Sequence, residues 1–153
     1  GADCGRRGTV LLPINHCVEV TLVWGIRGSD PDHHGRPVYE PDFDLEKAEV
    51  QEWLLHVCKA ARAEPHLLVR DEMPCWIEAF NSVESPQGGF PVEPATLETR
   101  LQSFFASRKA IEVYGDDVGT SGLGYKGRVR FVQARLRINV VAEAMDRTDL
   151  HEH

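Results

Sequence analysis

The chain has 153 residues, which is enough for one domain with a hydrophobic core and too few for two ordinary domains. The formal charge of −7 and the pI of about 5.5 argue against nonspecific nucleic-acid binding through a basic face. No run of apolar residues approaches the length of a membrane span. There is no initiator methionine and no signal peptide, so we interpret the chain as a domain excised from a longer protein.

The first predicted element is a strand over residues 18–24, where Val18, Val20, Leu22 and Trp24 alternate with other residues, as in a strand with one buried face. Residues 28–42 hold three prolines, two glycines and five charged residues and predict a loop.

Two amphipathic helices are expected next. Asp44 is a plausible N-cap for the first helix, which Pro65 ends and whose apolar stripe is Val50, Trp53, Leu54, Val57, Cys58 and Ala61. Residues 66–83 predict a short strand or a helical turn, and 85–94 a loop. Thr96 is the expected N-cap of the second helix, with Leu97, Leu101, Phe104 and Phe105 on its apolar face.

The last third of the chain predicts strands. "AIEVYG" (110–115) favours a strand, and the glycine-rich segment 115–127 a hairpin connection. The longest strand spans 129–140, and its apolar parity changes between Phe131 and Val132, which predicts a β-bulge or a strand that switches faces. The element order β-α-β-(β)-α-β-β favours an α+β sandwich, with two helices on one face of a mainly antiparallel sheet and a split βαβ (ferredoxin-like) topology.

The loop "SDPDHHG" carries residue types that bind metals: Asp30, Asp32, His33 and His34. Adjacent histidines in an extended loop point to opposite sides, and the other histidines are scattered along the chain. We therefore expect a solvated loop and no metal site. A metal-dependent hydrolase using Asp32, His33 and His34 is the alternative.

No other segment predicts catalysis. His56 lies beside the apolar stripe of the first helix, and we interpret it as a boundary residue. Glu78 and the pair Asp116 and Asp117 form no credible acid–base couple, and "GTSGLGYKG" lacks the spacing of a phosphate-binding loop. We expect no enzyme and no cofactor.

Four arginines, Arg128, Arg130, Arg135 and Arg137, line the long strand. They form either a solvated outer face or a docking surface for an acidic partner or lipid headgroups.

The four cysteines, Cys4, Cys17, Cys58 and Cys75, contain no C-x-x-C, so a zinc ribbon is not expected. Buried free thiols in a reducing compartment, as in a cytosolic interaction domain, and disulfides in an oxidising one both stay open. The chain has no N-x-[ST] glycosylation sequon.

Four segments, "VTLVWGI" (20–26), "FDLEKAEVQEWLLHVC" (43–58), "CWIEAF" (75–80) and "GRVRFVQARLRINV" (127–140), occur in an order that resembles an extracellular domain of Dispatched-type proteins. These belong with Patched to the resistance-nodulation-division (RND) superfamily. The second extracellular domain is the more similar one, and the resemblance spans about residues 18–145.

The resemblance implies a ferredoxin-like extracellular domain over 18–145, with an extension at 1–17 and a tail at 146–153 leading toward a membrane helix. It also implies a Cys58–Cys75 disulfide, to which a Cys4–Cys17 bridge is a weaker addition. We further expect Trp24, Trp53 and Phe131 in the core. The expected role is cargo or partner binding and gating in the traffic of sterols or lipid-modified, Hedgehog-type proteins. The expected partners are the neighbouring extracellular domain and the lipidic cargo.

Overall fold

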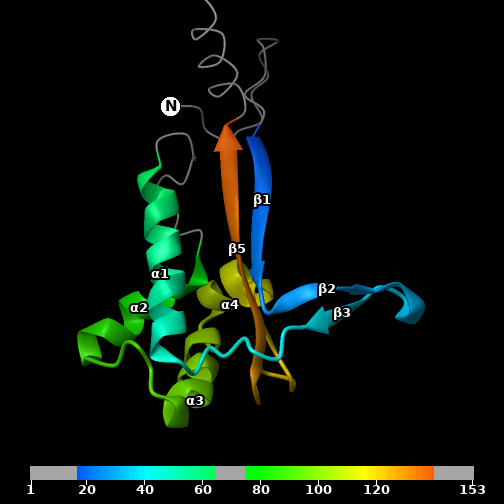
Figure 1. Cartoon of the computed structure of the whole chain (residues 1–153). Helices are drawn as coiled ribbons and strands as arrows, with labels where there is room; N and C mark the ends of the chain where they lie inside the picture. Colours follow the sequence, from blue (N-terminus) through cyan, green and yellow to red (C-terminus); the bar gives the residue numbers. More distant parts are fainter. Residues whose placement is uncertain (1–16, 65–74, 140–153) are drawn as a thin grey trace, which may run out of the picture.

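The central sheet has three antiparallel strands. A computed structural model of the chain describes residues 17–64 and 75–139, with residue 17 and residues 137–139 described by their backbone alone. β1 (Cys17–Trp24) pairs along its whole length with β5 (Val129–Asn139), and β4 (Val118–Thr120) pairs with the other side of β5 (Figure 1). The predicted strand at 18–24 and the long C-terminal strand are therefore confirmed.

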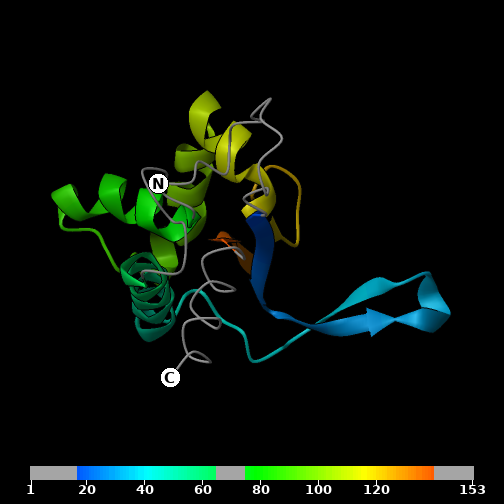
Figure 2. The ribbon, with the colours of Figure 1, turned by 90° about the horizontal axis from the view of Figure 1, so that it is seen from above.

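Four α-helices accompany this sheet in the described residues: α1 (Ala48–Ala63), α2 (Trp76–Glu84), α3 (Pro94–Phe105) and α4 (Arg108–Tyr114). Figure 2 shows the helices and the β2–β3 hairpin on opposite sides of β1 and β5. The fold is thus of the mixed α+β class, with four helices rather than the expected two. None of the helices within 17–64 and 75–139 has the length and apolar character needed to cross a membrane.

The segment 28–42, predicted as a loop, belongs mostly to a β-hairpin. β2 (Ile26–Asp30) pairs antiparallel with β3 (Arg36–Tyr39) through the short 3₁₀ turn Pro31–His33, and the hairpin projects away from the body (Figures 1 and 2). Its turn is closed by the Asp30 side chain, which accepts from the Asp32 amide at 2.9 Å. Both strands are mostly exposed, so they lack the apolar alternation that would have predicted them.

The segment 110–115, predicted as a strand, lies mostly in the helix α4 and continues into the 3₁₀ turn Gly115–Asp117. Ala110 is buried, whereas Ile111 and Val113 are 41% and 45% exposed. The β-branched residues that suggested a strand thus face outward, and helical spacing decides which side is buried. In α2 the helical alternative for residues 66–83 is confirmed from Trp76 onward; residues 65–74 lie outside the described residues.

Both predicted helix starts are displaced. α1 begins at Ala48, because the Asp44 carboxylate accepts from the Glu46 amide at 2.9 Å and forms a turn before the helix. α3 begins at Pro94, two residues before Thr96, with proline at the first helical position, where its missing N–H is no loss.

The predicted bulge is present but lies slightly earlier. The register of β4 against β5 shifts where Gly119 pairs with Phe131 and Thr120 pairs with Val129, which leaves Arg130 as the extra residue. Val129 and Val132 are consequently both buried. The irregularity therefore explains the change of parity seen in the sequence.

The core forms mainly between the helices and the inner face of the sheet. Its largest fully buried side chains include Trp76, Phe80, Leu45, Ile77 and Leu101. The expected core position of Trp53 is wrong, since this residue is 50% exposed and only packs edge-on against Trp24, at 5.7 Å between ring centroids. Trp24 is partly buried against the core. Phe131 is half-buried, and its ring lies against Gly119.

Gln51 on α1 is fully buried and connects two loops to that helix. Its Nε2 donates to the carbonyls of Leu45 and Val92, each at 2.9 Å, and its Oε1 accepts from the Val92 amide at 2.8 Å. The side chain thus satisfies three backbone groups in segments that form no ladder of their own.

Candidate functional site

A disulfide joins α1 to the start of α2. Cys58 lies on the buried face of α1, Cys75 directly precedes α2, and their Cα atoms are 6.2 Å apart, within the usual range for a disulfide. The two residues are only 3% and 1% exposed. This is the pairing that the resemblance implies, and the alternative of four free thiols is wrong for these two cysteines. Cys4 and the side chain of Cys17 lie outside the described residues.

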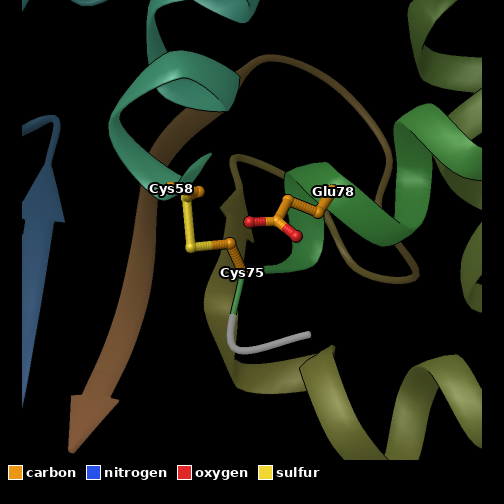
Figure 3. A group of neighbouring side chains, drawn as sticks. All are labelled: Cys58, Cys75 and Glu78. Carbon is orange, nitrogen blue, oxygen red and sulfur yellow. A yellow bond between two sulfur atoms is a disulfide. The ribbon is translucent and has the colours of Figure 1, made fainter. Parts of the chain in front are cut away.

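Glu78 lies beside this disulfide in the first turn of α2. Its side chain is 10% exposed, and Oε2 accepts from Nη2 of Arg62 at 2.6 Å. Oε1 is buried and has no hydrogen-bond partner among the described residues. The Sγ atoms of both cysteines and a carboxylate oxygen of Glu78 lie within 4.8 Å of one another, and Figure 3 shows the carboxylate turned toward the disulfide.

This cluster combines residue types that the sequence did not connect. From the sequence we assigned no acid–base role to Glu78 and no role to Arg62. The available signal was the spacing between Cys75 and Glu78, because residues three apart at the start of a helix lie on one face. Only the packing of α1 against α2 brings Arg62 and Cys58 to that face.

Two of the four arginines hold the base of the hairpin. Arg128 donates to the carbonyls of Pro41 and Phe43 at 2.9 and 2.8 Å. The Arg130 guanidinium lies 5.0 Å from the ring centroid of Tyr39, in β3. Both side chains are exposed. Their contacts connect the start of β5 to β3 and to the segment that follows it.

Arg135 pairs with a buried carboxylate. Its Nε lies 3.1 Å from Oδ1 of Asp117, and its Nη2 donates to the Val113 carbonyl at 2.8 Å. Gln133 donates to the same Asp117 oxygen at 3.2 Å. Burial raises the pKa of Asp117 above its ordinary value, which the hydrogen bond from Gln133 and the charge of Arg135 oppose. The side chain of Arg137 lies outside the described residues, and the three described arginines all contact their own chain.

The histidine loop forms a local pair. Nδ1 of His33 lies 2.7 Å from Oδ2 of Asp30, and both side chains are exposed. His34 has a positive φ of 58° and ends the 3₁₀ turn. Within the described residues, this loop forms no group of three metal-ligating side chains. The group of that kind in the described part of the chain is Cys58, Cys75 and Glu78. The side chain of His56, which the sequence places beside the apolar stripe of α1, is exposed.

A pocket of about 400 Å³ lies between α3 and the loops at its N-terminal end. Carboxylates of Asp44, Glu46 and Glu98 line it, together with Arg128 and apolar residues such as Leu97. The sequence did not predict it, because its walls come from segments far apart along the chain.

Comparison with protein-family models, with curated proteins and with solved structures finds no match to this chain.

Proposed function

We propose that this chain is an extracellular domain of a Dispatched-like membrane protein and that it binds a partner or lipidic cargo and takes part in gating, without catalysing a reaction. The observation that carries the proposal is the Cys58–Cys75 disulfide. It links the last residue of "FDLEKAEVQEWLLHVC" to the first residue of "CWIEAF", two of the segments on which the resemblance rests. A disulfide is typical of proteins in oxidising compartments, such as the cell exterior and the secretory lumen.

The geometry of β1 and β5 supports a domain inserted into a longer chain. Cys17, the first residue of β1, pairs with Asn139, the last residue of β5, so the described body enters and leaves at one end of the sheet (Figure 1). Adjacent ends favour insertion between two segments of another domain. In a split βαβ topology the first and last strands are antiparallel neighbours, as β1 and β5 are, but the last strand lies at the sheet edge, whereas β5 lies between β1 and β4.

For partner binding we propose the base of the exposed hairpin. Arg128 and Arg130 keep exposed guanidinium groups there, and their contacts with Pro41, Phe43 and Tyr39 fix the directions of both side chains. Charged groups that are already positioned lose less entropy on binding. An acidic surface of the neighbouring extracellular domain, or the headgroup of a lipidic cargo, fits this charge. Arg135 is engaged with Asp117 and therefore contributes less to the proposed surface.

The compartment can be tested with the full-length parent protein in cells. The substitution Arg27→Asn creates the sequon Asn-Gly-Ser at the exposed residues 27–29 of the hairpin, in a chain that has no sequon of its own. We expect the variant to gain one N-glycan, seen as a mobility shift that a glycosidase removes. Arg27→Gln is the matched control. An expressed, membrane-inserted variant that stays unglycosylated would contradict an extracellular or luminal position.

Cargo binding can be tested with a photoreactive cholesterol analogue added to membranes that contain the parent protein. We expect peptides from residues 17–139 to be labelled and an excess of cholesterol to prevent the labelling. The double substitution Arg128→Gln with Arg130→Gln distinguishes the two roles. If it reduces association with the neighbouring extracellular domain but not sterol labelling, the hairpin base binds a protein partner. Absence of both labelling and association would refute the proposed binding role.

A further inference from the structure

We propose that reduction of the Cys58–Cys75 disulfide creates a binding site for one zinc-type divalent cation. The ligands are Sγ of Cys58, Sγ of Cys75 and Oε1 of Glu78, and a water molecule fills the fourth position. The disulfide and the metal are alternatives, because sulfurs bonded to each other are no longer thiolates. The site rests on three side chains and their surroundings and is independent of the proposed function.

The positions of the three groups fit a tetrahedral shell. Zinc binds thiolate sulfur at about 2.3 Å and carboxylate oxygen at about 2.0–2.2 Å, so neighbouring ligand atoms in such a shell lie roughly 3.4–3.8 Å apart. The ligand atoms already lie within 4.8 Å of one another. With the Cα atoms of the cysteines 6.2 Å apart, rotation of the side chains separates the two sulfurs without moving the backbone.

The unpartnered oxygen of Glu78 points to a ligand. A buried carboxylate oxygen without a donor carries a desolvation cost that proteins usually avoid. Oε1 is buried with no hydrogen-bond partner among the described residues, whereas Oε2 of the same group is held by Arg62. Because Arg62 holds Oε2, Oε1 is the oxygen left to bind a cation. Figure 3 shows the carboxylate turned toward the two sulfurs.

The charges of the loaded site balance. Two thiolates and the Glu78 carboxylate carry three negative charges, and Arg62 with a divalent cation carries three positive ones. Neutrality matters here because both cysteines are buried and the Glu78 side chain is only 10% exposed, so an uncompensated charge would be poorly solvated. Without the metal, the reduced pair remains as neutral thiols beside the Glu78–Arg62 ion pair.

The redox step balances as a thiol–disulfide exchange. A dithiol reductant supplies two electrons and two protons, becomes a disulfide itself, and leaves Cys58 and Cys75 as thiols. Zinc then displaces the two thiol protons to solvent as it binds. Oxidation of the pair by a disulfide donor reverses both steps and releases the cation.

The test uses the purified chain with Cys4→Ser and Cys17→Ser, which leaves Cys58 and Cys75 as the pair that binds or is oxidised. A phosphine, which becomes a phosphine oxide, reduces the disulfide, and Co²⁺ is titrated as a spectroscopic substitute for Zn²⁺. We expect one Co²⁺ per reduced chain with a near-ultraviolet thiolate-to-cobalt absorption that Zn²⁺ abolishes. The oxidised chain should bind none.

Removing the Glu78 carboxylate distinguishes the proposed three-ligand site from metal binding by the two thiolates alone. Glu78→Gln should weaken Co²⁺ binding at least about tenfold, within the range for lost ligands and their supports. Glu84→Gln is the matched control, since Glu84 is a buried carboxylate on the same helix near Arg100, and it should leave the affinity unchanged. Equal affinity in the Glu78→Gln variant, or binding to the oxidised chain, would overturn the proposal. Circular dichroism shows whether the reduced chain stays folded, and an unfolded chain would bind without regard to Glu78.

Discussion

Gln51→Leu removes a buried amide and keeps a side chain of similar size. In the native chain the Gln51 amide satisfies the carbonyls of Leu45 and Val92 and the amide of Val92. All three residues are at most 3% exposed, so water cannot easily replace the lost bonds. We therefore expect this single substitution to be among the most destabilising that the helix α1 can carry.

The magnitude follows from the three groups left unsatisfied. Each buried backbone group without a partner costs about 1–3 kcal/mol, and the added apolar surface of leucine recovers roughly 1–2 kcal/mol. The net loss in the free energy of unfolding is about 4 kcal/mol, a large part of the 5–15 kcal/mol typical of a domain. With an m-value of about 2 kcal/mol/M, the urea midpoint falls by about 2 M.

Equilibrium unfolding in urea, followed by tryptophan fluorescence and by far-ultraviolet circular dichroism, measures this loss. Gln102→Leu is the control, because Gln102 makes one exposed side-chain bond to Glu98, and its effect should stay within about 0.5 kcal/mol. If Gln51→Leu lowers stability by less than about 1 kcal/mol, the three bonds are not what holds the two loops, and the reasoning is refuted.

Three further outcomes are expected. The double substitution Cys58→Ser and Cys75→Ser should lower the free energy of unfolding by roughly 3 kcal/mol, since it opens a loop with a sequence separation of 17; an unchanged urea midpoint would show that the disulfide does not constrain the unfolded chain. Asp117→Asn should gain stability relative to the parent as the pH rises from about 4 through the raised pKa of the buried carboxyl, because ionisation there disfavours the folded state; pH-dependent urea titrations with a constant difference between the two proteins would contradict this. Gly25→Ala should cost about 3 kcal/mol or more, because Gly25 has a φ of +97° and an added Cβ meets the Arg130 carbonyl; a thermal midpoint within about 2 °C of the parent would refute it.

The two main strands and the two long helices were predictable, because each has a periodic apolar face. The alternation at Val18, Val20, Leu22 and Trp24 marks β1, and the spacing of Leu97, Leu101 and Phe105 marks α3. The same rule failed where burial is slight. The hairpin strands are mostly exposed and so have no alternation to detect, and α4 turns its β-branched residues outward.

The candidate site was predictable only in part. The resemblance supplied the Cys58–Cys75 pairing, but the role of Glu78 depends on Arg62, which lies on another helix. Likewise, the arginine pattern is plain in the sequence, yet only the structure shows that Arg135 is used internally by Asp117. Charge type is a property of the residue, whereas the partner of a charge is decided by packing.

The sequence by itself determined the class of the protein: an acidic α+β domain whose periodic segments form a sheet strand, two long helices and a final bulged strand. The tertiary structure decided the features that depend on contacts between distant segments. Gln51 is a polar residue within an otherwise apolar stripe, and nothing local predicts that it should be fully buried. It is tolerated there because the loops at Leu45 and Val92, which are far apart along the chain, present backbone groups that need its amide.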